Sequence, residues 1–191
     1  MTDLTLASPA ATRRLGSSLA RLLQAPALVT LTGDLGTGKT TLVRAALRAL
    51  GVSEVVASPS FTIAQSYIGH DGVRLHHLDL YRLQPGPDVE LFPWEDYLDD
   101  AITFVEWPEA GAAELPPADI TIDLEHQSLM ERRATVAASA VYAPMLEKAL
   151  ADPALALDDP TLVDAEDAAM VDDRVDDAPG GESGAGEGGP R

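Results

Sequence analysis

The chain has no cysteine and little positive charge, and each shortage excludes a class of function. Without cysteine there is no disulfide framework, no thiol chemistry and no thiolate-ligated metal site. Thirteen basic residues stand against 31 acidic ones, and the pairs Arg13-Arg14 and Arg132-Arg133 form no long basic patch. Because contacts to phosphates need clustered Lys and Arg, we do not expect the chain to hold a nucleic acid unaided.

Long apolar runs are also missing. No uninterrupted apolar stretch approaches the ~18 residues that a membrane-spanning helix needs. Residues 1–5 lack the basic region and apolar core of a signal peptide. We therefore expect a soluble, cytoplasmic protein that makes no use of a membrane.

The C-terminal part of the chain differs in composition from the rest. Residues 151–191 carry twelve acidic and two basic side chains, a net charge of −10 out of −18 for the whole chain. No aromatic residue follows Tyr142. Such a segment cannot bury enough apolar surface to offset the entropy of ordering it. We predict one folded domain over residues 1–151 and a disordered acidic tail over residues 152–191, most simply a solvated spacer.

A glycine-rich segment, Gly33–Thr41, fits the P-loop pattern G-x-x-x-x-G-K-[ST]. The apolar run before it (27–31) predicts a buried strand, and residues 42–50 predict a helix that Gly51 stops. In this geometry backbone N–H groups turn inward around phosphates, and the helix N-terminus adds its positive dipole end. Lys39 then reaches the β- and γ-phosphates, and the Thr40 hydroxyl is placed to hold Mg²⁺. The residues expected at the nucleotide are Gly33, Gly36, Thr37, Gly38, Lys39 and Thr40.

The rest of the pattern predicts an α/β protein. Residues 84–100 are expected to form a loop with a short helix, and Ser8-Pro9 to begin the first helix. The other expected elements are an edge strand at 2–7, a hairpin of 62–68 and 73–80, a strand at 101–105, paired strands at 120–124 and 133–140, and a last helix at about 141–151. Since crossovers and hairpins mix, the predicted fold is a P-loop NTPase-like three-layer sandwich with a mixed central sheet.

A P-loop nucleotidase also needs a carboxylate at a strand end to hold Mg²⁺ and a group that orients the attacking molecule. Asp79 and Glu106 each follow a strand-like run, at the sheet edge where open α/β folds bind ligands. A lone strand-end acid is as often a solvated turn residue, but a P-loop in the same chain favours a metal-holding role. At most one of His76 and His77 is expected to touch the site, and Ser58-Pro59-Ser60 offers hydroxyls for a γ-phosphate sensor.

The chain contains no asparagine. The Asn-Lys-x-Asp segment with which GTPases read guanine therefore cannot be present. ATP is the better candidate for the nucleotide.

Four motifs occur in order along the chain: Gly-Asp-Leu-Gly-Thr-Gly-Lys-Thr-Thr-Leu, Ser-Pro-Ser-Phe-Thr, His-Leu-Asp-Leu-Tyr-Arg-Leu and Val-Glu-Trp-Pro-Glu. Together they resemble the TsaE (YjeE) family, small bacterial P-loop ATPases of tRNA N6-threonylcarbamoyladenosine biosynthesis. The resemblance covers about residues 4–140 and excludes the acidic tail. Ser60 stands where the family usually has Thr, and residues 92–97 depart from the usual Leu-Gly-rich segment.

The resemblance implies roles for particular residues. ATP would be bound by the P-loop, including Thr41, and by the loop opening the first helix, around Ser8 and Pro9. Asp79 would be the acid on the Mg²⁺ side. Glu106 would act on metal or water, and Trp107 would lie close to the nucleotide.

The resemblance also implies partners. The family works with a complex of TsaB and TsaD, in which TsaD transfers the threonylcarbamoyl group to A37 of tRNA. ATP binding and hydrolysis then support repeated turnover, and this acidic chain would meet tRNA only through those partners.

Two other functions stay open on the sequence. One is a small-molecule kinase, although such kinases usually need an arginine-bearing lid, and residues 84–100 are acidic. The other is a nucleotide-dependent switch with negligible turnover, because the same residues hold ATP in both cases.

Overall fold

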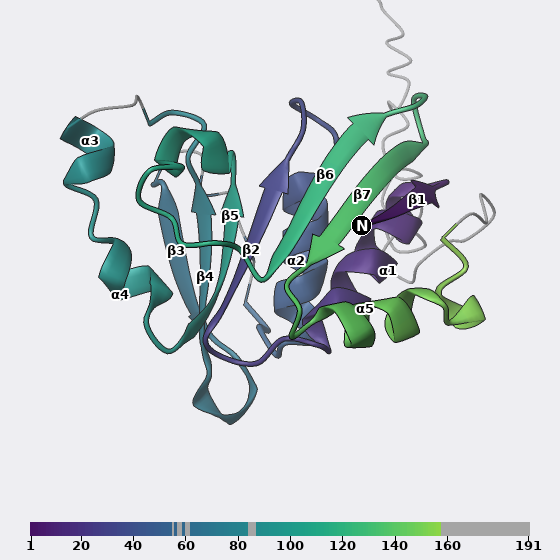
Figure 1. Cartoon of the computed structure of the whole chain (residues 1–191), viewed down its shortest axis with the longest axis horizontal. Helices are drawn as coiled ribbons and strands as arrows, with labels where there is room; N and C mark the ends of the chain where they lie inside the picture. The colour runs from purple at the N-terminus through teal and green to yellow at the C-terminus, as the bar shows by residue number, and fades with distance from the viewer. Residues whose placement is uncertain (55, 57–58, 60–61, 84–86, 158–191) are drawn as a thin grey trace, which may run out of the picture.

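The computed structural model describes residues 1–54, 56, 59, 62–83 and 87–157 (Figure 1). The strands are β1 (Thr2–Leu6), β2 (Ala27–Thr32), β3 (Ala64–Ile68), β4 (Arg74–Asp79), β5 (Ala101–Glu106), β6 (Ile120–His126) and β7 (Arg132–Ala138). The α-helices are α1 (Pro9–Ala20), α2 (Lys39–Ala49), α3 (Pro87–Glu90), α4 (Trp94–Leu98) and α5 (Ala143–Leu150), and the 3₁₀ helices are η1 (His70–Gly72), η2 (Pro108–Gly111) and η3 (Pro153–Leu155). None of the helices within these ranges has the length and apolarity of a membrane span.

The strands form one sheet in the order β1-β7-β6-β2-β5-β4-β3. β2 runs parallel to β5 and β6, and β4 runs parallel to β5. The pairs β1–β7, β6–β7 and β3–β4 are antiparallel. The predicted mixed sheet is confirmed, and because the central strands share one direction, their carboxyl ends meet at one edge of the sheet.

α1 and α2 pack together on one face of the sheet, behind β2, β6 and β7 in Figure 1. As predicted, Ser8 caps α1, accepting from the Ala11 amide at 3.2 Å, and Pro9 occupies the first helical position. The helices approach closely at Gly16, where a Cβ would lie 2.3 Å from the Leu42 carbonyl oxygen. This close packing holds the first turn of α2 against the middle of α1.

The other face is covered over β4 and β5 by α3, α4 and the segment around η2. A second apolar cluster fills this layer, with Leu78, Trp94 and Val105 among its buried members. Residues 87–98 form two short helices where the sequence predicted one. The three-layer arrangement is confirmed.

The folded chain continues past the predicted domain boundary. Leu155 and Leu157 are buried in the same core as α1, and the Ala7 amide donates to the Leu157 carbonyl at 2.9 Å. The boundary predicted at residue 151 is therefore too early, because two leucines within the acidic composition have an apolar site beside α1 and β1. The remainder of the predicted tail, residues 158–191, lies outside the described part of the chain.

Chains ending at residue 151 and at residue 157 are expected to differ in stability. Burial of one Leu side chain contributes about 1.5–3 kcal/mol, so loss of both Leu155 and Leu157 should lower the melting temperature by roughly 6–24 °C for a domain of this size. The chain ending at 157 should melt like the full-length protein, because the acidic remainder has the composition of a solvated segment. Differential scanning calorimetry of the three chains tests this, and equal melting of all three would show that residues 152–157 contribute nothing.

Candidate nucleotide-binding site

The P-loop joins β2 to α2, as the sequence predicts. Gly33, Gly36 and Gly38 have φ of +118°, +77° and +106°, values that residues with a Cβ rarely adopt. At Gly33 a Cβ would also lie 2.1 Å from the Leu124 carbonyl oxygen, so β6 passes directly against the start of the loop. Gly38 is the N-cap of α2, and no side chain of the described residues caps this helix. The N–H groups at the helix start are thus available to an anion.

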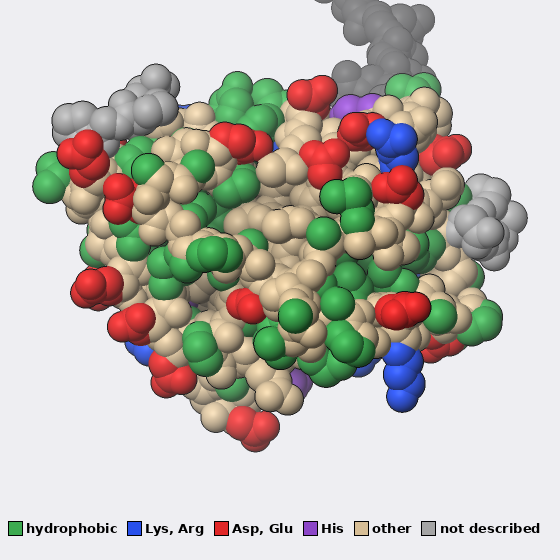
Figure 2. Space-filling model, in the orientation of Figure 1, with side chains coloured by type: hydrophobic (Ala, Val, Ile, Leu, Met, Phe, Trp, Pro, Cys, Tyr) green, Lys and Arg blue, Asp and Glu red, His purple; other side chains and the backbone are tan. Residues whose placement is uncertain are grey.

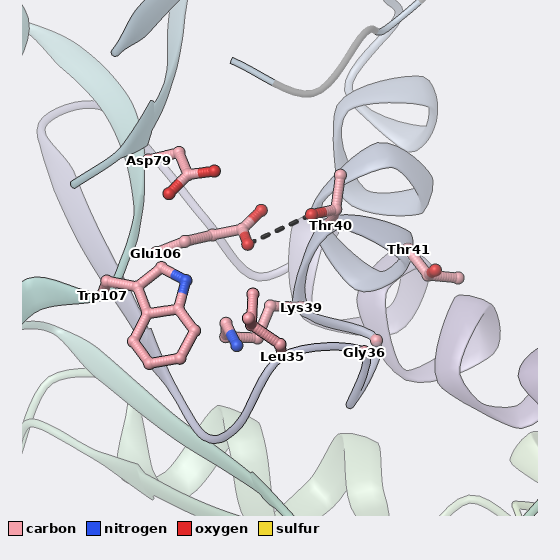
Figure 3. Close-up of a pocket in the computed structure, with 9 residues that line it drawn as sticks. Leu35, Gly36, Lys39, Thr40, Thr41, Asp79, Glu106 and Trp107 are labelled. Carbon is pink, nitrogen blue, oxygen red and sulfur yellow. Dashed lines mark hydrogen bonds between the residues drawn. The ribbon is translucent and has the colours of Figure 1, made fainter. Parts of the chain in front are cut away.

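A pocket of about 220 Å³ opens between the P-loop and the carboxyl ends of β4 and β5 (Figure 3). This volume is below the ~300–1,000 Å³ of pockets that enclose a whole drug-sized ligand, so it suits the phosphates of a nucleotide better than the entire molecule. The residues that line it are Leu35, Gly36, Gly38, Lys39, Thr40, Thr41, Asp79, Glu106 and Trp107.

Asp79 and Glu106 are the last residues of their strands, and the parallel register of β4 and β5 places them side by side. Both are buried, with 7% and 3% of their surface exposed. Asp79 Oδ1 accepts from the Tyr81 amide at 3.1 Å, and Glu106 Oε2 accepts from the Thr40 hydroxyl at 3.1 Å (Figure 3). Two neighbouring carboxylates repel each other when both are ionised, and a cation between them relieves that repulsion.

Lys39, one of two lysines in the chain, is buried beside these acids. Its Nζ donates to the carbonyls of Gly33 at 2.5 Å and Asp34 at 2.8 Å, and lies 4.0 Å from the centroid of the Trp107 ring. Burial lowers the pKa of the Lys39 ammonium, and the neighbouring carboxylates oppose that shift. An ammonium group forms stronger, charge-assisted hydrogen bonds with phosphate oxygens than with neutral carbonyls. We therefore expect Lys39 to exchange the Gly33 and Asp34 carbonyls for phosphate oxygens when a phosphate group binds.

His77 supports Glu106 from behind. Its side chain has no exposed surface, and its Nε2 lies 2.8 Å from Glu106 Oε1. Nδ1 is buried and has no hydrogen-bond partner among the described residues, so we assign the proton to Nε2, which leaves only a lone pair unpartnered. His76 lies on the opposite face of β4 against Ser66 and Tyr97. Strand alternation thus explains why one histidine at most touches the site, as predicted.

The donor set suits a Mg²⁺ ion that binds together with phosphate. Mg²⁺ usually takes one or two carboxylates, with substrate phosphates and waters completing its shell. The pocket offers the carboxylates of Asp79 and Glu106 and the hydroxyl of Thr40. Within the described ranges, no group of three or more His, Cys, Asp or Glu could hold a metal ion. The two carboxylates and the hydroxyl fit a Mg²⁺ ion whose remaining ligands are phosphate oxygens and waters.

Some residues predicted for the nucleotide do not line the pocket. Gly33 and Thr37 take part in hydrogen bonds within the loop: the Gly33 carbonyl accepts from Lys39 Nζ, and the Thr37 hydroxyl donates to the Asp34 carbonyl at 2.9 Å. Ser8 and Pro9 do not line the pocket either, so their contact with a nucleotide stays a prediction. Thr41 lines it but points away from the carboxylates in Figure 3.

The suggested γ-phosphate sensor cannot be placed. Ser58, Ser60 and Phe61 lie outside the described residues. Pro59 lies between them, and its carbonyl accepts from the amides of Thr62 and Ile63 at 2.8 Å. The role of the segment therefore stays a prediction.

Two residues at the site were not assigned a role from sequence. Leu35 lines the pocket mouth with 62% of its surface exposed, and nothing in the P-loop pattern specifies its side chain. His77 was detectable in principle, because residues two apart on a strand share a face and His77 precedes Asp79 by two. The sequence pattern does not show that β5 pairs with β4, and this pairing brings Glu106 within hydrogen-bond distance of His77.

A family model described as "Threonylcarbamoyl adenosine biosynthesis protein TsaE" matches residues 6–135, more than half of the chain. The chain belongs to the TsaE family. The resemblance inferred from the four motifs is confirmed, and the P-loop, both strand-end acids and Trp107 lie within the matched region.

Several relatives carry the name "tRNA threonylcarbamoyladenosine biosynthesis protein TsaE". The protein of Streptomyces coelicolor is 46% identical over 106 residues, which are 54% of this chain and 71% of the relative. That of Haemophilus influenzae is 40% identical over 100 residues, covering 52% of this chain and 63% of the relative, slightly less than two thirds of its length. The relative from Treponema pallidum is 35% identical, and the match covers 66% of this chain and 93% of that protein.

A solved structure supports the fold. The crystal structure of Bacillus subtilis YdiB superposes with a TM-score of 0.64 at 28% identity, covering 78% of this chain and 93% of YdiB. The architecture around the P-loop is therefore that of an experimentally observed fold.

Proposed function

We propose that this TsaE-family protein binds ATP with Mg²⁺ in the P-loop pocket, hydrolyses it weakly alone, and supports formation of tRNA N6-threonylcarbamoyladenosine together with TsaB and TsaD. The observation that carries the proposal is the placement of Asp79 and Glu106 side by side, facing Thr40 at the start of α2. The names of the relatives support the same biosynthetic role. The missing guanine-reading segment favours ATP over GTP.

In this proposal each residue has a separate part in hydrolysis. The P-loop N–H groups and Lys39 hold the β- and γ-phosphates. Thr40, Asp79 and Glu106 are the residues that would hold Mg²⁺, which neutralises developing phosphate charge when bound. Because His77 fixes one oxygen of Glu106, the carboxylate has a defined orientation from which to accept a hydrogen bond from the attacking water.

A route from the site to the surface supports nucleotide-dependent partner binding. The Lys39 ammonium lies over the ring of Trp107, and that ring packs against Tyr81 at 4.9 Å between centroids. Tyr81 has 52% of its surface exposed. Trp107 has a φ of +57°, a conformation that is rare for a bulky residue and is found at functional sites. A shift of Lys39 toward phosphate therefore changes the contacts of an aromatic pair that reaches solvent.

The surface charge supports an indirect role toward tRNA. The chain has 31 acidic and 13 basic residues, and the face shown in Figure 2 carries scattered acidic side chains and few basic ones. A protein that neutralised several phosphates of tRNA would present clustered Lys and Arg on its binding face. An indirect contact with tRNA, made through TsaB and TsaD, does not require a basic face on this acidic protein.

We expect association with TsaB–TsaD to be at least about tenfold tighter in ATP than in ADP, since a nucleotide that binds both states equally shifts nothing. Light-scattering titrations in a non-hydrolysable ATP analogue, ADP and no nucleotide measure this difference.

Ser60→Ala is predicted to weaken association in ATP more than ATP binding itself, because it removes the hydroxyl suggested to sense the γ-phosphate. Identical association in all three conditions would contradict the switch.

Phosphate release with and without TsaB–TsaD separates the competing functions. Release that rises in the presence of the partners supports the proposal. Transfer of phosphate to a small metabolite would support the kinase, and tight ATP binding with no release under either condition would support the switch without turnover.

A further inference from the structure

The β6–β7 hairpin ends beside the P-loop, and the last pair of its ladder departs from the apolar pattern of the strands. Leu124 on β6 and Ala134 on β7 are fully buried on the face that carries α1 and α2. The next residues on that face are His126 and Arg132, which are direct partners in the register. At this end of the hairpin the sheet face lies against the P-loop and no longer against the helices. Polar side chains occupy the positions that apolar core residues occupy farther along the strands.

Both side chains contact backbone carbonyls of the P-loop. Arg132 Nε donates to the Thr37 carbonyl at 3.2 Å, and His126 Nε2 donates to the Leu35 carbonyl at 3.3 Å. Through Nη1, Arg132 also donates to three carbonyls of the hairpin tip within residues 128–131, at 2.9, 3.2 and 3.0 Å. A single guanidinium therefore joins the hairpin tip to the loop.

Each of these two loop carbonyls belongs to a peptide group whose N–H is carried by a pocket residue. In a planar trans peptide the C=O and the following N–H point in opposite directions. Holding the Thr37 carbonyl outward therefore holds the Gly38 N–H inward, and the Leu35 carbonyl does the same for the Gly36 N–H. Gly36 and Gly38 line the pocket, and glycine has the least intrinsic preference for one backbone conformation.

We propose that Arg132, assisted by His126, is a positioning residue that orients the Gly36 and Gly38 peptides so that their N–H groups face the phosphate site. Arg132 does not line the pocket itself and acts through the backbone of the loop. Donors that are already oriented need no reorganisation when the anion arrives. The inference rests on the proposed binding of ATP at this pocket, but the orientation of the loop exists without nucleotide and can be measured there.

The first experiment uses the nucleotide-free full chain. Backbone ¹⁵N relaxation should give order parameters for the Gly36 and Gly38 amides near the rigid range of about 0.85 in the wild type, falling toward about 0.6 in Arg132→Ala. Arg133→Ala is the matched control: Arg133 is the next residue in the chain, lies 49% exposed, and pairs with Glu125 at 2.7 Å on the opposite face of the sheet. It should leave both amides unchanged.

The second experiment measures affinity by calorimetry with Mg²⁺ and a non-hydrolysable ATP analogue. Arg132→Ala should raise the Kd about tenfold, and Arg133→Ala by less than about twofold. Arg132→Lys should resemble Arg132→Ala, because one ammonium cannot span the tip and the loop as the guanidinium does. In hydrolysis with partners present, KM should rise for Arg132→Ala while kcat stays within about twofold, since the residue does not touch the reacting atoms.

Unchanged order parameters at Gly36 and Gly38 in a folded Arg132→Ala protein would overturn the inference. So would an Arg132→Lys protein with full wild-type affinity, or an equal loss from Arg133→Ala, because either result would assign the effect to net charge. Absence of ATP binding by the wild type would instead refute the proposed function, and the relaxation data would still decide the role of Arg132.

Discussion

Lys39→Met is expected to weaken binding of ATP about 10- to 150-fold, which corresponds to the ~1.5–3 kcal/mol of a hydrogen bond to a charged group. Lys39 is buried and lies at the start of α2, and among the described residues its Nζ donates to two neutral carbonyls and lies over the Trp107 ring. Methionine keeps the aliphatic part of the side chain and removes the charge, so the loss reports the phosphate contact more than packing. Calorimetry with a non-hydrolysable ATP analogue measures it.

The chain supplies its own control for this experiment. Lys148, the other lysine of the chain, lies exposed in the last turn of α5. Lys148→Met removes the same charge far from the loop and should leave the Kd unchanged. Equal affinities for Lys39→Met and the wild type would show that the nucleotide does not use the P-loop lysine.

Asp79→Asn and Glu106→Gln are expected to lower ATP hydrolysis on the order of 10²-fold or more while changing nucleotide affinity far less. Both substitutions keep the size of the side chain and remove the negative charge that Mg²⁺ or the attacking water requires. Asp79→Asn retains an oxygen for the Tyr81 amide, and Glu106→Gln retains one for His77. The local fold should therefore survive, and kcat should fall more than affinity.

Phosphate release in the presence of TsaB–TsaD is the measurement. Glu109→Gln provides the control, because Glu109 is a nearby exposed acid that does not line the pocket. It should hydrolyse ATP at the wild-type rate. If Asp79→Asn and Glu106→Gln do so as well, the assignment of the two strand-end acids is wrong.

Composition misled the prediction at the end of the domain. Averaged over residues 151–191 the segment is acidic and poor in aromatic residues, and that average conceals two leucines six or fewer residues past the predicted boundary. Leu155 and Leu157 are buried because α1 and β1 offer them an apolar surface. Whether a short apolar pair docks depends on the surface that it meets, which composition does not contain.

The P-loop and its flanking elements were determined by the sequence alone. Strand, glycine turn and helix are consecutive in the chain, and their conformations depend on local preferences: β-branched residues in β2, positive φ at Gly33 and Gly38, and the helix formers of α2. The β3–β4 hairpin followed for the same reason, since its turn lies between its strands. The four motifs also indicated the family to which the chain belongs.

The assembly of the site was decided by the tertiary structure. The sequence placed Asp79 and Glu106 each at a strand end, but their adjacency follows from the order β2-β5-β4 and from the register that pairs them. The support of Glu106 by His77 and of the Thr37 carbonyl by Arg132 joins residues 29 and 95 positions apart. Strand order and register depend on how apolar faces pack across the whole domain, and a local pattern specifies only which face a residue occupies.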